Sequence, residues 1–142
     1  MPDFMPDCTF CQIAAGEIAA HIVLDDDAAL AFLDHSPLFF GHVLVVPRGH
    51  HVELADLPAH VVGPYFDRVQ RMSVAVPAAV GAIGSFVAMN NIVSQSVPHL
   101  HCHVVPRRPR DGLRGFFWPR TRYRDVSHMA EVAAAIRGEL AR

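Results

Sequence analysis

Three histidines alternate with apolar residues along the run His99-Leu100-His101-Cys102-His103-Val104-Val105. Successive side chains of a β-strand point to opposite faces, so a strand here predicts three imidazoles on one face and apolar side chains on the other. Imidazole titrates near neutral pH and serves as a base, a nucleophile or a metal ligand. Histidines clustered in this way mark functional sites more often than packing, so this run is the first candidate for chemistry.

One metal ion bound by all three histidines conflicts with strand geometry. Neighbours on one face are about 6.6 Å apart, which separates the Cα atoms of His99 and His103 by about 13 Å. Separate tasks are therefore favoured, with His101 as a nucleophile or base and His103 as a donor to an anion. Attack of a neutral imidazole on a phosphate ester or anhydride would split one difficult displacement into two easier ones.

A cysteine pair near the N-terminus offers a second chemistry. Cys8 and Cys11 have the spacing of a metal or redox site, but only seven residues precede Cys8, and a thioredoxin-like motif needs a strand there. With His99 and either His50 or His51, the two thiols could form a closed, tetrahedral zinc site. The alternative is a pair of buried thiols without metal.

The elements that must position these groups predict a single antiparallel α+β domain. Two apolar runs flank Asp25-Asp26-Asp27, which predicts a β-hairpin with an acidic turn. Strands are expected over residues 21–24, 28–33, 41–47, 86–89 and 99–105. Helices are expected over residues 11–17, from an N-cap at Asp56 toward Gly81 with breaks or kinks at Pro64 and Pro77, and over residues 127–140 with one buried apolar stripe.

The composition excludes several classes of function. The chain of 142 residues has three cysteines, a net charge of −2 and no lysine, which excludes lysine nucleophiles and argues against a disulfide framework. No segment predicts a membrane span or a signal peptide, so we expect a cytoplasmic protein without membrane or nucleic-acid partners. Seven of the twelve arginines lie between Arg107 and Arg124, in a segment that could meet phosphates or remain solvated.

The chain resembles the histidine-triad (HIT) family, and the resemblance runs from about Cys8 to Arg107. Residues 99–105 match the family's motif His-φ-His-φ-His-φ-φ, in which φ is apolar. Gln95-Ser96-Val97-Pro98 is similar to the family's lead-in to that motif. Residues 32–34, 41–47 and His50 also stand where the family has its equivalents, and the cysteine pair is similar to that of the zinc-bearing bacterial branch.

The resemblance implies a HIT-like fold: a five-stranded antiparallel sheet with a long helix and a C-terminal helix, and sheets joined across a homodimer. It implies one HIT domain over residues 1–142, with a flexible leader at 1–7 and a C-terminal extension with a helix at 107–142. The implied activity is nucleotide hydrolysis or transfer at the α-phosphate of AMP- or GMP-type substrates. These would be nucleoside phosphoramidates, dinucleoside polyphosphates or aminoacyl adenylates, processed through a nucleotidyl-histidine intermediate.

The resemblance also implies a role for individual residues. His101 would be the nucleophile and His103 would contact the scissile phosphate, while Ser96 would donate to the leaving group and His42 would support this network. Asp34 would accept the ribose hydroxyls. The remaining binding residues would be Phe10, Ile13 and Phe32 around the base, with Thr9 beside them, and Gln95 with Asn90 or Asn91 at the phosphate. A structural zinc ion would be held by Cys8, Cys11, His50 and His99.

Three features depart from the family's pattern. Ser94 stands where glycine is usual, and the loop between Asn90 and Gln95 is about two residues short, which affects the site next to the leaving group. His35 replaces a typical isoleucine beside the base pocket. Downstream, Arg114 and Trp118 could reach toward a partner's site or simply cover a surface.

Two other functions compete with this hypothesis. A nucleotide-binding regulatory protein would bind AMP or GMP tightly with little turnover. A zinc hydrolase would lose its activity on chelation, but open zinc sites usually keep a general base nearby, and no carboxylate lies near the triad in the sequence.

Overall fold

The computed structural model describes residues 4–113 and 120–142. The chain forms two compact units, Met1–Asp111 and Gly112–Arg142. Arg114 and Trp118, which the sequence singles out, lie outside the described residues. The predicted sites all fall in the first unit.

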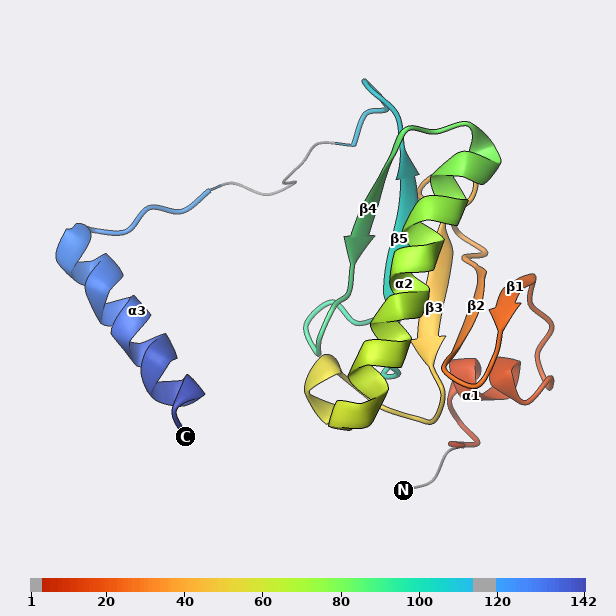
Figure 1. The fold of residues 1–142 in the computed structure, drawn as a ribbon, viewed down its shortest axis with the longest axis horizontal. Coiled ribbons are helices and arrows are strands. Elements are labelled where there is room, and N and C mark those ends of the chain that lie inside the picture. Colours follow the sequence, from red (N-terminus) through yellow and green to blue (C-terminus); the bar gives the residue numbers. More distant parts are fainter. Residues whose placement is uncertain (1–3, 114–119) are drawn as a thin grey trace. The chain divides into compact units, whose positions relative to one another are not determined.

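The first unit is built on an antiparallel sheet with strand order β1-β2-β3-β5-β4 (Figure 1). Its strands are β1 (Ile22–Asp25), β2 (Ala29–Leu33), β3 (Val43–Pro47), β4 (Gly84–Ala88) and β5 (Cys102–Arg107). All four pairings are antiparallel. The predicted five-stranded antiparallel sheet is therefore confirmed.

The acidic turn between β1 and β2 is held by one carboxylate. Asp26 Oδ1 accepts hydrogen bonds from the backbone N–H groups of Ala28 (2.9 Å) and Ala29 (3.0 Å). An aspartate that bonds its own backbone two residues on forms a tight turn, so the predicted hairpin is confirmed. Arg68 of the long helix donates to Asp26 Oδ2 at 3.0 Å and ties the turn to that helix.

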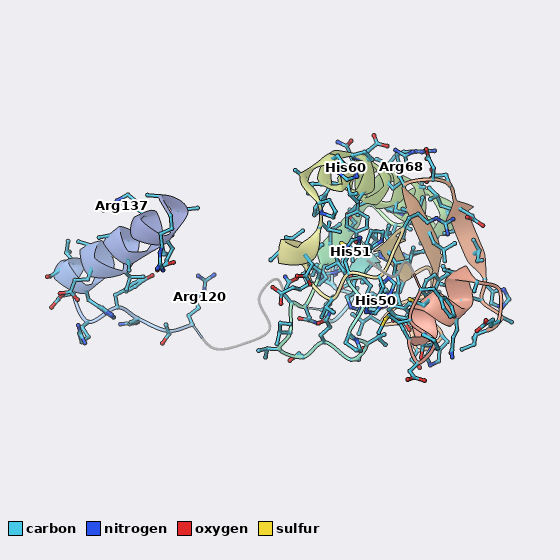
Figure 2. All side chains as sticks on the ribbon, turned by 90° about the horizontal axis from the view of Figure 1, so that it is seen from below. His50, His51, His60, Arg68, Arg120 and Arg137 are labelled. Carbon is cyan, nitrogen blue, oxygen red and sulfur yellow. The ribbon has the colours of Figure 1, made fainter. Side chains whose placement is uncertain are left out.

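The long helix α2 (Ala59–Val80) begins later than predicted, after a short 3₁₀ turn, η1 (Leu54–Asp56). The predicted N-cap at Asp56 is wrong, because its carboxylate accepts from the Glu53 N–H within the 3₁₀ turn, and Pro58 occupies the N-cap position. Pro64 and Pro77 lie inside α2 without ending it. Figure 2 shows His60 and Arg68 on this helix, and His50 and His51 on the chain after β3.

The sheet packs two apolar clusters, one on each face. Tyr65, Val69, Met72 and Val76 of α2 pack against alternate residues of β2, β3 and β5 on one face. On the other face, the short helix α1 (Thr9–Ala14) packs against the intervening residues of β2 and β3. This helix starts two residues earlier than predicted and ends at Ala14 rather than near Glu17. The sheet thus separates the α2 core from the face that α1 covers.

The histidine run lies partly outside its strand. The predicted strand over 99–105 is wrong at its start, because β5 begins at Cys102 and its pairing with β3 ends at Val45 opposite Cys102. The backbone N–H of Leu100 instead donates to the His51 carbonyl at 2.6 Å. Leu100, Cys102 and Val104 are nonetheless buried together in the α2 core, as the alternation predicts.

The second unit contains helix α3 (Val126–Leu140). Asp125 caps it by accepting from the His128 N–H at 2.8 Å. Within this unit, taken by itself, the predicted apolar stripe is not buried: α3 has no buried residue, and Met129 and Ile136 are half exposed. None of the described helices is both long and apolar enough to cross a membrane.

Candidate nucleotide site and metal cluster

A cavity of about 700 Å³ opens on the α1 face of the sheet. Its lining includes these predicted site residues: Thr9, Phe10, Ile13, Phe32, Asp34, Ser96, His101 and His103. His35 also lines it, as do Ile18 and His21, for which the sequence carried no signal. Residues from five separate segments, at positions 9–13, 18–21, 32–35, 44 and 96–103, therefore meet around one space large enough for a small-molecule ligand.

Two aromatic rings form one wall of this cavity. The rings of Phe10 on α1 and Phe32 on β2 meet edge to face with centroids 5.4 Å apart. The Phe10 ring also contacts the imidazole of His101, with centroids 5.0 Å apart. Aromatic pairs of this geometry give a rigid apolar surface suited to a planar ring.

The central histidine has a defined tautomer. Nδ1 of His101 lies 2.8 Å from the carbonyl oxygen of His99, and a carbonyl can only accept a hydrogen bond. Nδ1 therefore carries the proton, and Nε2 of the neutral ring keeps its lone pair. His101 is only 3% exposed, so few water molecules compete for that lone pair.

His42 and His103 are linked into a directional chain of hydrogen bonds. The backbone N–H of Leu38 donates to His42 Nδ1 at 3.0 Å, so the proton of the neutral His42 ring is on Nε2. That Nε2–H donates to His103 Nδ1 at 2.9 Å, which leaves the His103 proton on its Nε2. His103 is thus set to donate from Nε2, the nitrogen that does not face His42.

Burial keeps the rings of this chain neutral. The pKa of His103 is lowered to about 4, mainly by burial and also by the neighbouring His101 and His42, while Asp34 acts in the opposite direction. Burial also lowers the pKa of His42, although the Asp34 carboxylate, 3.6 Å away, raises it. Both imidazoles are therefore hydrogen-bond donors without net charge at pH 7.

Asp34, His42 and His103 also bring three potential metal-ligand atoms within 4.8 Å of one another. The Leu38 hydrogen bond argues against a metal ion there. It keeps the proton on His42 Nε2, and a protonated nitrogen has no lone pair to offer a metal. We therefore interpret this group as a hydrogen-bonded relay.

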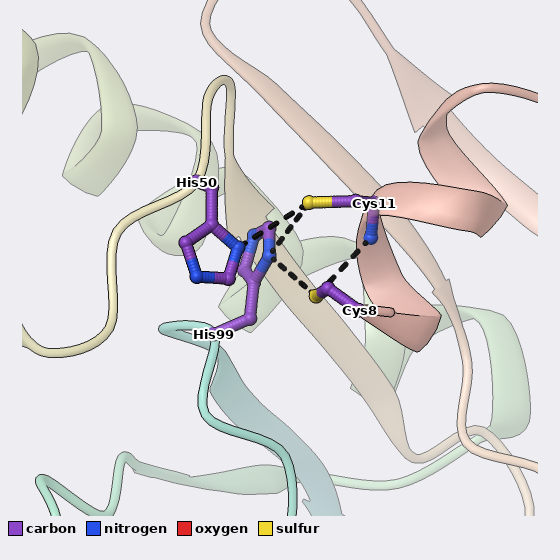
Figure 3. Close-up of side chains that lie close together, drawn as sticks. All are labelled: Cys8, Cys11, His50 and His99. Carbon is purple, nitrogen blue, oxygen red and sulfur yellow. Dashed lines mark hydrogen bonds between the residues drawn. The ribbon is translucent and has the colours of Figure 1, made fainter. Parts of the chain in front are cut away.

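A second cluster has the donor set of a zinc site. Cys8, Cys11, His50 and His99 place one ligand atom each within 4.8 Å of the others (Figure 3). The Sγ–Nδ1 distances are 3.4 Å for Cys8–His99, 3.3 Å for Cys11–His50 and 3.6 Å for Cys11–His99. Tetrahedral zinc with ordinary bond lengths separates sulfur and nitrogen ligands by about 3.5 Å, so the residues fit this ion.

Local structure orients the two thiols, and burial keeps the two imidazoles unprotonated. Cys8 is the N-cap of α1 and its sulfur accepts from the Cys11 N–H, which turns both thiols to the same side. Burial lowers the pKa of His99 to about 3 and also lowers that of His50, so both imidazoles are unprotonated at neutral pH. Burial raises the pKa of the Cys11 thiol, which a bound cation would reverse. His51 is not among the four clustered residues, and this favours His50 as the ligand.

The loop before the triad uses its polar side chains internally. Gln95 Nε2 donates to the Val52 carbonyl at 2.6 Å, and its Oε1 accepts from the Ile92 N–H at 3.1 Å. Asn91 Oδ1 accepts from the Leu54 N–H at 2.8 Å. Gln95, Asn90 and Asn91 are not among the residues that line the cavity. The side chains of Gln95 and Asn91 instead hold the loop against the segment after β3.

Backbone strain marks the same loop. Ile92 and Ser94 have φ angles of 68° and 61°, in the left-handed region that favours glycine. Ser94 stands where glycine is usual in the resembled family, and its φ shows why glycine suits this position. The shortened loop therefore keeps two residues in strained conformations beside Ser96.

Comparison with known proteins is consistent with this geometry. The HIT domain family model matches residues 15–110. The Arabidopsis thaliana "Adenylylsulfatase HINT3" is 36% identical over 109 residues, which are 75% of this chain and 55% of that protein, so the chain spans about half its length. The Schizosaccharomyces pombe "Adenosine 5'-monophosphoramidase hnt1" is 32% identical over 114 residues, 79% of this chain and 83% of that one.

Solved structures show the same fold. SMU.412c from Streptococcus mutans UA159 superposes with a TM-score of 0.88 at 32% identity, covering 99% of this chain and 89% of its own. A zinc-bound histidine-triad protein from Mycobacterium smegmatis has a TM-score of 0.71 at 34% identity, with 96% and 98% covered. With most of the chain matched by the family model and by these relatives, the protein belongs to the HIT family.

Proposed function

We propose that this protein is a nucleotide hydrolase or transferase that acts at the α-phosphate of adenosine phosphoramidates or dinucleoside polyphosphates. The observation that carries the proposal is the tautomer of His101, whose Nδ1–H is bound to the His99 carbonyl and whose Nε2 retains its lone pair. A buried imidazole whose Nε2 keeps its lone pair, beside a cavity, is a suitable nucleophile toward phosphorus. The activities named for the two relatives, on an adenylyl sulfate and an adenosine phosphoramidate, support the same reaction class.

The first step would form a covalent nucleotidyl enzyme. His101 Nε2 attacks the α-phosphorus, a P–N bond forms to the imidazole, and the bond to the leaving group breaks. The positive charge that develops on the ring is stabilised by the Nδ1–H bond to the His99 carbonyl. His103, fixed by His42, donates from Nε2 to a phosphoryl oxygen. A leaving amine takes up one proton, delivered through the Ser96 hydroxyl from water.

In the second step, water attacks the same phosphorus. Its oxygen stays on the nucleotide, and His101 leaves as the neutral imidazole. The proton that this water loses neutralises the hydroxide left when the amine was protonated, so the enzyme and the solvent return to their initial state. The nucleoside would stay in place, with its base against the wall formed by Phe10 and Phe32 and its ribose hydroxyls bonded to Asp34.

Single-turnover kinetics with a labelled adenosine phosphoramidate test this mechanism. His101→Ala should abolish both the labelled covalent enzyme and AMP release, whereas His60→Ala, an exposed substitution on α2, should retain both. Wild-type rates in His101→Ala would refute the mechanism. Tight AMP binding without turnover in the wild type would instead support a nucleotide-binding regulatory protein.

We also propose that Cys8, Cys11, His50 and His99 hold a structural zinc ion. Four protein ligands leave no open position, so the ion would cross-link α1 to the segments around His50 and His99 and would not activate water. Chelation should therefore lower the unfolding temperature, and activity should be lost only as far as folding is lost. Activity that disappears on chelation while the fold is intact would favour a zinc hydrolase.

The edge of the sheet supports a homodimer in this proposal. β4 is the last strand in the sheet order and pairs with β5 alone among the described strands. Ile83 and Val87 beside that edge are 81% and 42% exposed, and Val74 on α2 is 68% exposed. A terminal strand with exposed apolar neighbours favours pairing with a second copy of the same strand. Light scattering on the purified protein tests this, and a monomer at micromolar concentration would exclude it.

A further inference from the structure

A second cavity of about 380 Å³ adjoins the nucleotide cavity. The two share three lining residues, Thr9, Ser96 and Val97, so these side chains stand between them. His101 and His103 line the first cavity and are not in the lining of the second. The second cavity therefore begins where the nucleotide cavity ends, on the far side of Ser96 from the nucleophile.

The second cavity has one carboxylate in its described lining and no arginine. The carboxylate is that of Asp7, in the turn before α1. Two hydrogen bonds hold this turn on the helix: the Cys8 N–H donates to the Met5 carbonyl at 2.9 Å, and Gln12 Nε2 donates to the Pro6 carbonyl at 2.7 Å. The backbone of Asp7 is thus held beside the cavity, and its side chain is exposed to solvent.

The charge of Asp7 is not balanced by a neighbouring cation. Among the described residues, no arginine or histidine forms an ion pair with it, whereas Asp25, Asp26 and Asp27 are all paired with Arg48 or Arg68. A zinc ion with two thiolate ligands would add no net charge beside it, because the two thiolates balance the ion. The second cavity therefore presents one negative charge to whatever enters it.

We propose that the second cavity binds the leaving group of the substrate, and that Asp7 selects leaving groups that carry a positive charge, such as amines with a second ammonium. This inference rests on the proposed nucleotidyl transfer to His101. In an in-line displacement the leaving group lies opposite the attacking nitrogen, with the phosphorus between them. With His101 in one cavity and Ser96 at the boundary, the group that departs enters the other cavity. Sulfate or phosphate leaving groups would meet the repulsion of Asp7 there.

The size of this selectivity follows from the exposure of Asp7. An exposed pair of opposite charges is worth about 0.2–1 kcal/mol, which corresponds to a rate factor of up to about fivefold. Repulsion of an anion has the opposite sign and a similar size. The preference for a cationic over an anionic leaving group should therefore be up to about 25-fold, and salt should weaken it.

Three adenosine 5′-phosphoramidates of equal chain length test the proposal, made from ethylenediamine, propylamine and β-alanine. Their leaving groups are cationic, neutral and anionic at pH 7. The wild type should have the highest kcat/KM for the first and the lowest for the last. Asp7→Asn should lower the value for the cationic amidate, raise that for the anionic one and leave the neutral one unchanged.

Asp67→Asn is the matched control, because it removes one exposed carboxylate from α2, on the opposite face of the sheet. It should retain the wild-type order of the three amidates. Equal changes in Asp7→Asn and Asp67→Asn, or an unchanged order in Asp7→Asn, would overturn the assignment of Asp7. Failure of the wild type to hydrolyse any of the three would instead refute the proposed function.

Discussion

The depressed pKa of His103 predicts a specific loss of stability in mild acid. The folded protein holds the pKa of His103 at about 4, against 6.5 for an ordinary histidine. Below pH 6.5, His103 therefore becomes protonated in the unfolded chain while it stays neutral in the folded protein. Unfolding becomes more favourable as the pH falls toward 4. The effect is fully developed below pH 4 and absent well above pH 6.5.

The magnitude follows from the two pKa values. At pH 5 the unfolded form gains about 2.0 kcal/mol from protonation of this residue, and at pH 7 about 0.2 kcal/mol. His103 alone should therefore lower the free energy of unfolding by about 1.8 kcal/mol between pH 7 and pH 5. In His103→Gln this contribution is missing, because glutamine does not titrate.

Urea denaturation at pH 7 and pH 5 measures the difference. The wild type and His103→Gln share their other nine histidines, so titration of those residues largely cancels in the comparison. The control is His60→Gln on the exposed surface of α2, which should lose as much stability as the wild type. If His103→Gln loses the same stability as the wild type over this range, His103 is not held neutral by burial and the relay is misinterpreted.

Three further predictions concern strain, burial and metal. Ile92→Gly should stabilise the protein by about 1 kcal/mol, because Ile92 has a φ of 68°, whereas Val93→Gly next to it should not; urea unfolding measures both. Tyr65→Phe should lower the free energy of unfolding by about 1–2 kcal/mol in the same assay, because the buried Tyr65 hydroxyl donates to the Val45 carbonyl at 2.8 Å. An unchanged free energy of unfolding would show that this hydrogen bond does not contribute to stability. Cys11→Ser should lose zinc in a chelator titration and unfold at a lower temperature, and retention of zinc would exclude the four-ligand site.

The alternation of residues 99–105 could be predicted because it depends only on extended backbone. Leu100 is buried in the α2 core although it precedes β5, since an extended segment alternates its side chains whether or not it is paired. The end of the pairing could not be predicted, because it depends on a contact with His51, nearly fifty residues away along the chain.

Long-range contacts account for most of what the sequence could not predict. Asn91 and Gln95 bond to backbone groups of Leu54 and Val52, and no local pattern indicates such partners. Asp56 has the residue type of an N-cap, but a competing 3₁₀ turn takes its carboxylate. The cysteine–histidine cluster could be predicted, because thiols and imidazoles are few and their chemistry restricts how they combine.

The bonds that orient the imidazoles differ in how they respond to mutation. His101 is oriented by the carbonyl of His99, and His42 by the N–H of Leu38, and both are main-chain groups. Every residue has a main-chain carbonyl, and all but proline have the N–H, so most substitutions at these two positions leave the orienting group in place. Only the bond between His42 and His103 joins two side chains. The orientation of the relay is therefore most sensitive to substitution of His42 or His103.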